Sequence, residues 1–205
     1  MSNQETFDEF RKANEEERFR QKEQELIEQL RRRTQRQAER QEISEITGIA
    51  DEEILRTLQE LGYTRETIGL LHLVPLAQIA WASGSVTTQE RALALRLSEW
   101  RGVEKDSPAW RQLNCWLDER PTDEFFLTTL RIIRHILDSE TGKPYATSRA
   151  DLISFCMRIA TASGGFLGVG NKISEGEQLA LDQIVEELTK RNPEAVRQVV
   201  ERIEG

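Results

Sequence analysis

The sequence predicts an all-α protein: a helical bundle with a pseudo-two-fold internal repeat, preceded by a long charged N-terminal helix. Three observations predict this fold. No segment sustains the alternation of apolar and polar residues, rich in β-branched side chains, that a sheet requires. Helix start signals recur along the chain from residue 51 onward. A six-residue segment occurs twice, 80 residues apart, in the same helical context.

The composition excludes several classes of protein. The 205 residues carry a formal net charge of −8, which argues against a protein built mainly to bind nucleic acid. The two cysteines, Cys115 and Cys156, are too few for a disulfide scaffold or a Cys-only zinc site, and their apolar neighbours indicate core positions. No apolar run approaches the roughly 20 residues needed to span a bilayer, and the charged start is unlike a signal peptide. We therefore expect a cytoplasmic protein without membrane insertion or a nucleic-acid partner.

Residues 1–45 form a segment of their own, in which 22 of 45 residues are charged and neither proline nor glycine occurs. Opposite charges recur four residues apart, as in Glu28 and Arg32, which supports a helix. Apolar residues at coiled-coil spacing are followed by polar residues on the same seam: Phe19, Leu26 and Leu30, then Arg33 and Gln37. Two interpretations stay open: a solvated helix, or a helix that pairs with a partner protein or with itself.

Residues 46–205 suffice for a single all-helical domain, and its helix starts follow one another in order. Capping residues open the expected helices: Asp51, Thr64, Thr87, Ser107 before Pro108, Thr122, Ser148, Ser174 and Asn192. Gly62 should end the first of these helices, and Pro75 should kink or split the second. The tryptophans are expected to anchor the first half of the core: Trp81, Trp100, Trp110 and Trp116.

A short segment occurs twice in this domain. Residues 79–84 are Ile-Ala-Trp-Ala-Ser-Gly and residues 159–164 are Ile-Ala-Thr-Ala-Ser-Gly, identical at five of six positions. Small residues let two helices approach closely, and the terminal glycine can adopt a positive φ where the first helix ends. Two helix–turn–helix units, about residues 68–101 and 148–190, therefore indicate a bundle with approximate two-fold symmetry.

The second copy carries an insertion, residues 165–171, beyond which the two copies match again. Its glycine spacing is that of a phosphate loop, but Asn171 stands where lysine is required and no strand precedes it, so a plain loop is favoured. Each copy then opens a helix with Thr or Ser and has Glu three residues later, at Glu90 and Glu177. Such capping boxes give both glutamates a structural role.

The repeated pattern, Ala-x-Ala-Ser-Gly-x-Val-Thr-x-x-Glu in the first copy, resembles the signature of TerB-like domains of the tellurite-resistance and stress-response group, over residues 64–190. The resemblance implies an all-α bundle with pseudo-two-fold symmetry. It also implies divalent metal bound by an Asp of the turn and the Glu of the following helix. In this sequence Ser83 and Ser163 occupy the Asp positions, so Glu90 and Glu177 remain as candidate metal ligands.

Two functions are therefore predicted. The first is a non-enzymatic cytoplasmic interaction or scaffold module of the TerB-like stress-response kind, without a cofactor. Its partner would be another protein, or a second copy of the chain, bound through the N-terminal helix or the bundle surface. The alternative is a divalent-metal-binding module that uses Glu90 and Glu177 with backbone oxygens. No nucleophile has a base at a recognisable spacing, so we do not expect an enzyme.

Overall fold

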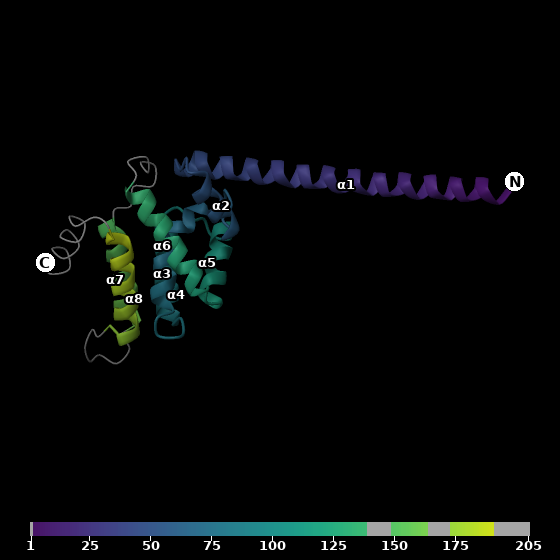
Figure 1. Ribbon diagram of the computed structural model, residues 1–205. Coiled ribbons are helices and arrows are strands. Elements are labelled where there is room, and N and C mark those ends of the chain that lie inside the picture. The colour runs from purple at the N-terminus through teal and green to yellow at the C-terminus, as the bar shows by residue number, and fades with distance from the viewer. Residues whose placement is uncertain (1, 139–148, 164–172, 191–205) are drawn as a thin grey trace. The chain divides into compact units, whose positions relative to one another are not determined.

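The computed structural model describes the backbone of residues 2–138, 149–163 and 173–190, and the side chains within 17–138, 151–161 and 173–190. Every regular element in these residues is a helix, which confirms the all-α prediction for them (Figure 1). The elements are α1 (Ser2–Thr47), α2 (Glu52–Glu60), the 3₁₀ helix η1 (Ile68–Leu73), α3 (Val74–Ala80), α4 (Thr88–Trp100), α5 (Pro108–Asp118), α6 (Asp123–Asp138), α7 (Arg149–Ser163) and α8 (Glu175–Thr189). The chain divides into two compact units, Met1–Glu42 and Ile43–Gly205.

The first unit consists of one continuous helix, the greater part of α1 (Figure 1). This confirms the long helix expected from the charged segment. Arg32 donates to the carboxylate of Glu28 one turn earlier, as the charge spacing predicted. Large apolar side chains nevertheless face solvent along this helix: Phe19 (70% exposed), Leu26 (56%), Ile27 (44%) and Leu30 (54%). We call these four residues the α1 stripe.

The helix boundaries of the second unit follow its capping residues. The predicted capping residues of five helices accept a backbone N–H bond: Asp51, Thr87, Ser107, Thr122 and Ser174. Gly62 has φ +84° just beyond α2, where it ends the helix. Pro75 lies in the first turn of α3, and the expected helix is split into η1 and α3. The start predicted at Thr64 is wrong: residues 65–67 form a turn, and η1 begins at Ile68. The helix starts predicted at Ser148 and Asn192 lie outside the described residues.

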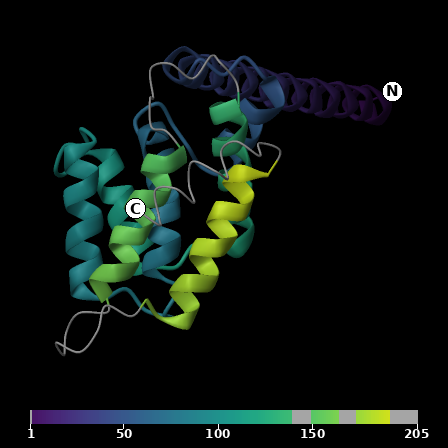
Figure 2. The same ribbon diagram turned by 90° about the vertical axis from the view of Figure 1, so that its left-hand side faces the viewer.

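Helix α3 is the buried centre of the second unit. Six of its seven residues are buried: Val74, Pro75, Leu76, Ala77, Ile79 and Ala80. The helix contacts η1, α4, α5, α6, α7 and α8, and its two alanines let neighbouring backbones approach. Helices α7 and α8 lie side by side against this centre (Figure 2). The Gly84 turn that follows α3 has φ +93°, as its position in the repeat predicted.

Two predicted core residues lie on the surface instead. Trp100 is 71% exposed, and Cys115 is exposed although Cys156 is buried. The reason is helical phase: α5 buries Ala109, Leu113, Trp116 and Leu117 on one face, and Cys115 lies on the other. Trp100 is the last residue of α4, where its ring leaves the bundle and meets Phe155 edge-on. Both residues have apolar neighbours in the sequence, and that pattern alone could not show that Trp100 and Cys115 lie outside the core.

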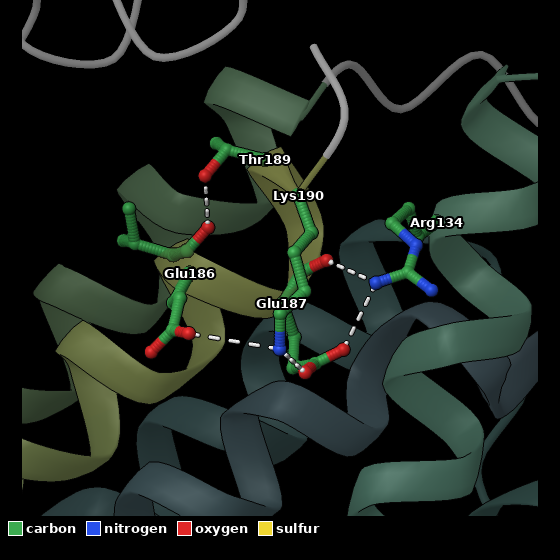
Figure 3. Close-up of polar contacts among 6 residues, drawn as sticks. Arg134, Glu186, Glu187, Thr189 and Lys190 are labelled. Carbon is green, nitrogen blue, oxygen red and sulfur yellow. Dashed lines mark hydrogen bonds and ion pairs between the residues drawn. The ribbon is translucent and has the colours of Figure 1, made fainter. Parts of the chain in front are cut away.

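An ion-pair cluster ties α6 to the end of α8 (Figure 3). Arg134 donates to the Glu187 carboxylate at 3.0 Å and to the Glu187 carbonyl at 3.2 Å, and Lys190 pairs with the other carboxylate oxygen. Burial of the Glu187 carboxyl opposes its ionisation. The hydrogen bond and charge of Lys190, with the charges of Arg134 and Arg131, outweigh burial and hold its pKa below 4.5.

Replacing Arg134 with methionine should lower the free energy of unfolding by about 2 kcal/mol, because the buried Glu187 carboxylate would lose the less exposed of its two cationic partners. Lys190→Met is the matched control: Lys190 pairs with the same carboxylate but is half-exposed, so its loss should cost less than about 1 kcal/mol. Urea denaturation at pH 7 measures both. Equal costs for the two variants would contradict this account of the cluster.

Candidate functional site

The first capping box lies at the start of α4. The Thr87 hydroxyl accepts from the backbone N–H of Glu90 at 3.2 Å, and the Glu90 Oε2 accepts from the backbone N–H of Thr87 at 2.6 Å. The Thr87 hydroxyl also donates to the same Oε2 at 2.7 Å. Both donors that the capping box is meant to satisfy are therefore paired. Glu90 is completely buried despite its charge.

The second capping box repeats this geometry at the start of α8. The Ser174 hydroxyl accepts from the backbone N–H of Glu177 at 3.2 Å, and the Glu177 Oε2 accepts from the backbone N–H of Ser174 at 2.6 Å. Glu177 is buried as well. The β-branched residues before the two boxes, Val86 and Ile173, pack against the core as their place in the repeat predicted.

The start of α8 packs directly on the turn of the first copy. A Cβ added to Gly176 would lie 2.4 Å from the carbonyl oxygen of Ala82, so only glycine fits at this contact. The next residue, Glu177, lies close enough to Glu90 for its charge to raise the pKa of Glu90. The fold therefore brings together two carboxyl groups that are 87 positions apart in the sequence.

The electrostatics of Glu90 are unfavourable for a negative charge. Burial raises the pKa of Glu90 and the charge of Glu177 raises it further, while the bonds from Thr87 lower it. Among the described residues, the buried Oε1 of Glu90 has no hydrogen-bond partner. A buried carboxylate oxygen without a donor is costly. We therefore expect a proton, a water molecule or a cation to satisfy this oxygen.

The structure describes the side chain of only one of the two serines, Ser83 and Ser163, that stand where the TerB-like signature has aspartate. Ser83 is exposed, and its hydroxyl donates to the Ser85 carbonyl at 3.1 Å within the turn. Ser163 is the last residue of α7, and its side chain lies outside the described residues, as does the insertion at 165–171.

A divalent cation fits the described side chains only in part. Glu90 and Glu177 supply two carboxyl groups within range of each other's charge, whereas a Ca²⁺ ion takes six to eight oxygens. No cluster of three or more His, Cys, Asp or Glu side chains with metal-binding geometry occurs in the described residues. A cation held here would depend on main-chain oxygens of the two turns for its remaining ligands.

A pocket of about 910 Å³, which the sequence did not predict, opens between η1 and the connection from α4 to α5. Trp100, Arg101 and Glu104 line it on one side, and the buried His72 lines it on the other. Burial, with the charge of Arg101, lowers the pKa of His72 to about 4, so this imidazole is neutral near pH 7. In the sequence, the only indication of this pocket would be the segment Trp100-Arg101-Gly102. That segment is equally typical of an ordinary helix end, so it could not have predicted a pocket.

Within the described residues, no helix combines the length and apolarity needed to cross a bilayer. Comparisons with known protein families, with characterised proteins and with solved structures return no match to this chain.

Proposed function

We propose that the chain is a non-enzymatic cytoplasmic interaction module of the TerB-like stress-response kind, in which α1 makes the contact and the helical domain is the scaffold. The α1 stripe is the observation that carries the proposal. Four of the six exposed large apolar side chains among the described residues fall within twelve residues of α1. Apolar groups gathered on one side of an otherwise charged helix are typical of a surface that another helix covers.

The two capping boxes support the TerB-like part of the proposal. Their hydrogen bonds have the same lengths in both copies, and each glutamate is buried at the start of the second helix of its unit. Gly176, in the first turn of the second helix of one unit, contacts Ala82 in the turn of the other, and this close contact supports a packing of the two units about an approximate two-fold axis.

Site-specific photo-crosslinking in the native cells tests the proposal. A photoreactive residue at Leu30, on the α1 stripe, should give covalent adducts. The same residue at Arg32, about 200° further round the helix, is the matched control and should give none. Adducts from neither position, or equally from both, would contradict an interaction through the α1 stripe.

A divalent-metal-binding module is the second candidate, and the buried Oε1 of Glu90 beside Glu177 favours it. The two carboxylates would hold the cation together with main-chain oxygens.

Thermal unfolding of metal-stripped protein with Ca²⁺, Mg²⁺, Mn²⁺ or Zn²⁺ tests the second candidate. A cation at a hundred times its dissociation constant would stabilise the fold by about 2.7 kcal/mol, which raises the Tm by several degrees. The gain should disappear in Glu90→Gln and in Glu177→Gln, and persist in Glu104→Gln, whose carboxyl lies at the separate pocket. A Tm that no cation changes would remove this candidate.

A further inference from the structure

We infer that α1 pairs with α1 of a second copy of this chain as a short antiparallel coiled coil, with the two-fold axis passing beside Glu28. This inference rests on the proposed function and names its partner. In this pairing, seam residue n of one copy, at an a or d position, lies opposite seam residue 56 − n of the other. At the edges of the seam, e positions face e positions and g positions face g positions. Residues 14–42 then overlap over about 43 Å at 1.5 Å per residue.

The register follows from the apolar side chains. Heptad spacing places Phe19, Leu26 and Arg33 at d positions, and Glu23, Leu30 and Gln37 at a positions. In an antiparallel pair, each a residue faces a d residue of the other helix. Leu26 therefore packs on Leu30 of the second copy, in two layers related by the two-fold axis.

The same register pairs the charges that interrupt the seam. Glu23 lies opposite Arg33 of the second copy, again in two symmetric layers, so two core charges that would break a parallel dimer become ion pairs. A parallel pair would instead set Glu23 against Glu23 and Arg33 against Arg33. The polar seam residue Gln37 faces Phe19, whose large ring covers it.

The overall charge of the helix favours the same orientation. Residues 14–27 hold five acidic and three basic residues, whereas residues 29–42 hold two acidic and five basic residues. Antiparallel pairing sets the first segment against the second, and parallel pairing sets each segment against itself.

The flanking positions complete the contact. Ile27, at position e, lies across from Ile27 of the second copy and extends the apolar centre. Lys22 at position g lies across from Arg36, which is a like-charge pair at the solvent-exposed rim. The apolar core is small, so we expect a weak dimer in rapid exchange with monomer.

Sedimentation equilibrium of the full chain over a concentration series tests the pairing. Wild-type protein should show a monomer–dimer equilibrium. Glu23→Arg and Arg33→Glu should each raise the dissociation constant about tenfold, because each sets like charges together in two layers. The double variant E23R/R33E should return to within about threefold of wild type, because the pairs are restored with exchanged sign.

Matched controls separate the seam from general charge effects. Arg31→Glu makes the same charge change as Arg33→Glu at position b, which faces away, and should leave dimerisation unchanged. Arg36→Glu should tighten the dimer, because it turns the rim pair with Lys22 into an attraction. Circular dichroism of each variant checks that α1 stays helical.

A chain that stays monomeric throughout the series overturns the antiparallel dimer, and so do single charge variants that the double variant fails to rescue. Monomeric protein that still forms adducts with a different protein at Leu30 would overturn the dimer and leave the proposed function standing. Monomeric protein with no adducts at Leu30 would remove both.

Discussion

Replacing Gly176 with alanine is expected to lower the free energy of unfolding of the helical unit by about 2 kcal/mol. The added Cβ would lie 2.4 Å from the Ala82 carbonyl oxygen, and that atom belongs to backbone that cannot rotate away as a side chain would. Alanine is the better helix former, so the loss measured is the packing cost minus a gain of up to about 1 kcal/mol. For a unit of this size, the Tm should fall by about 4–8 °C.

Gly69→Ala is the matched control for this prediction. Gly69 lies in η1 without a positive φ, and nothing lies within 4 Å of its added Cβ. Its replacement should leave stability unchanged or raise it by up to about 1 kcal/mol. Equal Tm values for the two variants would contradict the close contact between α8 and the first turn.

Glu90→Gln and Glu90→Ala are expected to change stability in opposite directions. Glutamine keeps an oxygen that accepts from the backbone N–H of Thr87, and it removes the buried charge that burial and the charge of Glu177 disfavour. At pH 7 it should match or exceed the stability of wild type. Alanine loses the capping bond and leaves a cavity, which should cost about 2 kcal/mol.

The pH dependence of the same variants isolates the Glu90 carboxyl. Because its pKa in the folded protein is raised above 4.5, the folded state binds this proton more tightly than the unfolded state does. The contribution of Glu90 to the free energy of unfolding therefore falls as pH rises from 4.5 through the raised pKa. Glu187 acts in the opposite sense: its pKa is lowered, so its contribution is present above 4.5 and is lost as pH falls below that value.

The measurement is urea denaturation of wild type and Glu90→Gln between pH 4 and 8. The free energy of unfolding of wild type should fall relative to that of Glu90→Gln as pH rises above 4.5. The two values should approach each other as pH is lowered toward 4. Parallel curves over the whole range would show that Glu90 titrates normally and that burial does not disfavour its charge. A metal-loaded sample compared with a stripped one would show whether a cation replaces the proton.

Local features were predictable because their causes lie within a few residues. The capping boxes at Thr87 and Ser174, the end of α2 at Gly62 and the split at Pro75 each depend on hydrogen bonds or steric limits between neighbours in sequence. The prediction of α1 was equally local, because an uninterrupted run of charged helix formers needs no tertiary contact to be recognised. The TerB-like assignment and the metal role of Glu90 and Glu177 stay predictions.

The sequence by itself determined the all-helical class, most helix starts in the described residues and the turn of the first copy at Gly84, because hydrogen-bond capping and backbone sterics act locally. Only the tertiary structure decided which apolar residues are buried, because the helical phase of Trp100 and Cys115 depends on what packs beside them. Tertiary packing also decided that Gly176 touches Ala82 and that Glu90 lies within range of the charge of Glu177. These proximities join residues about 90 positions apart, and they follow from the packing of α8 beside the turn that follows α3, which no local pattern encodes.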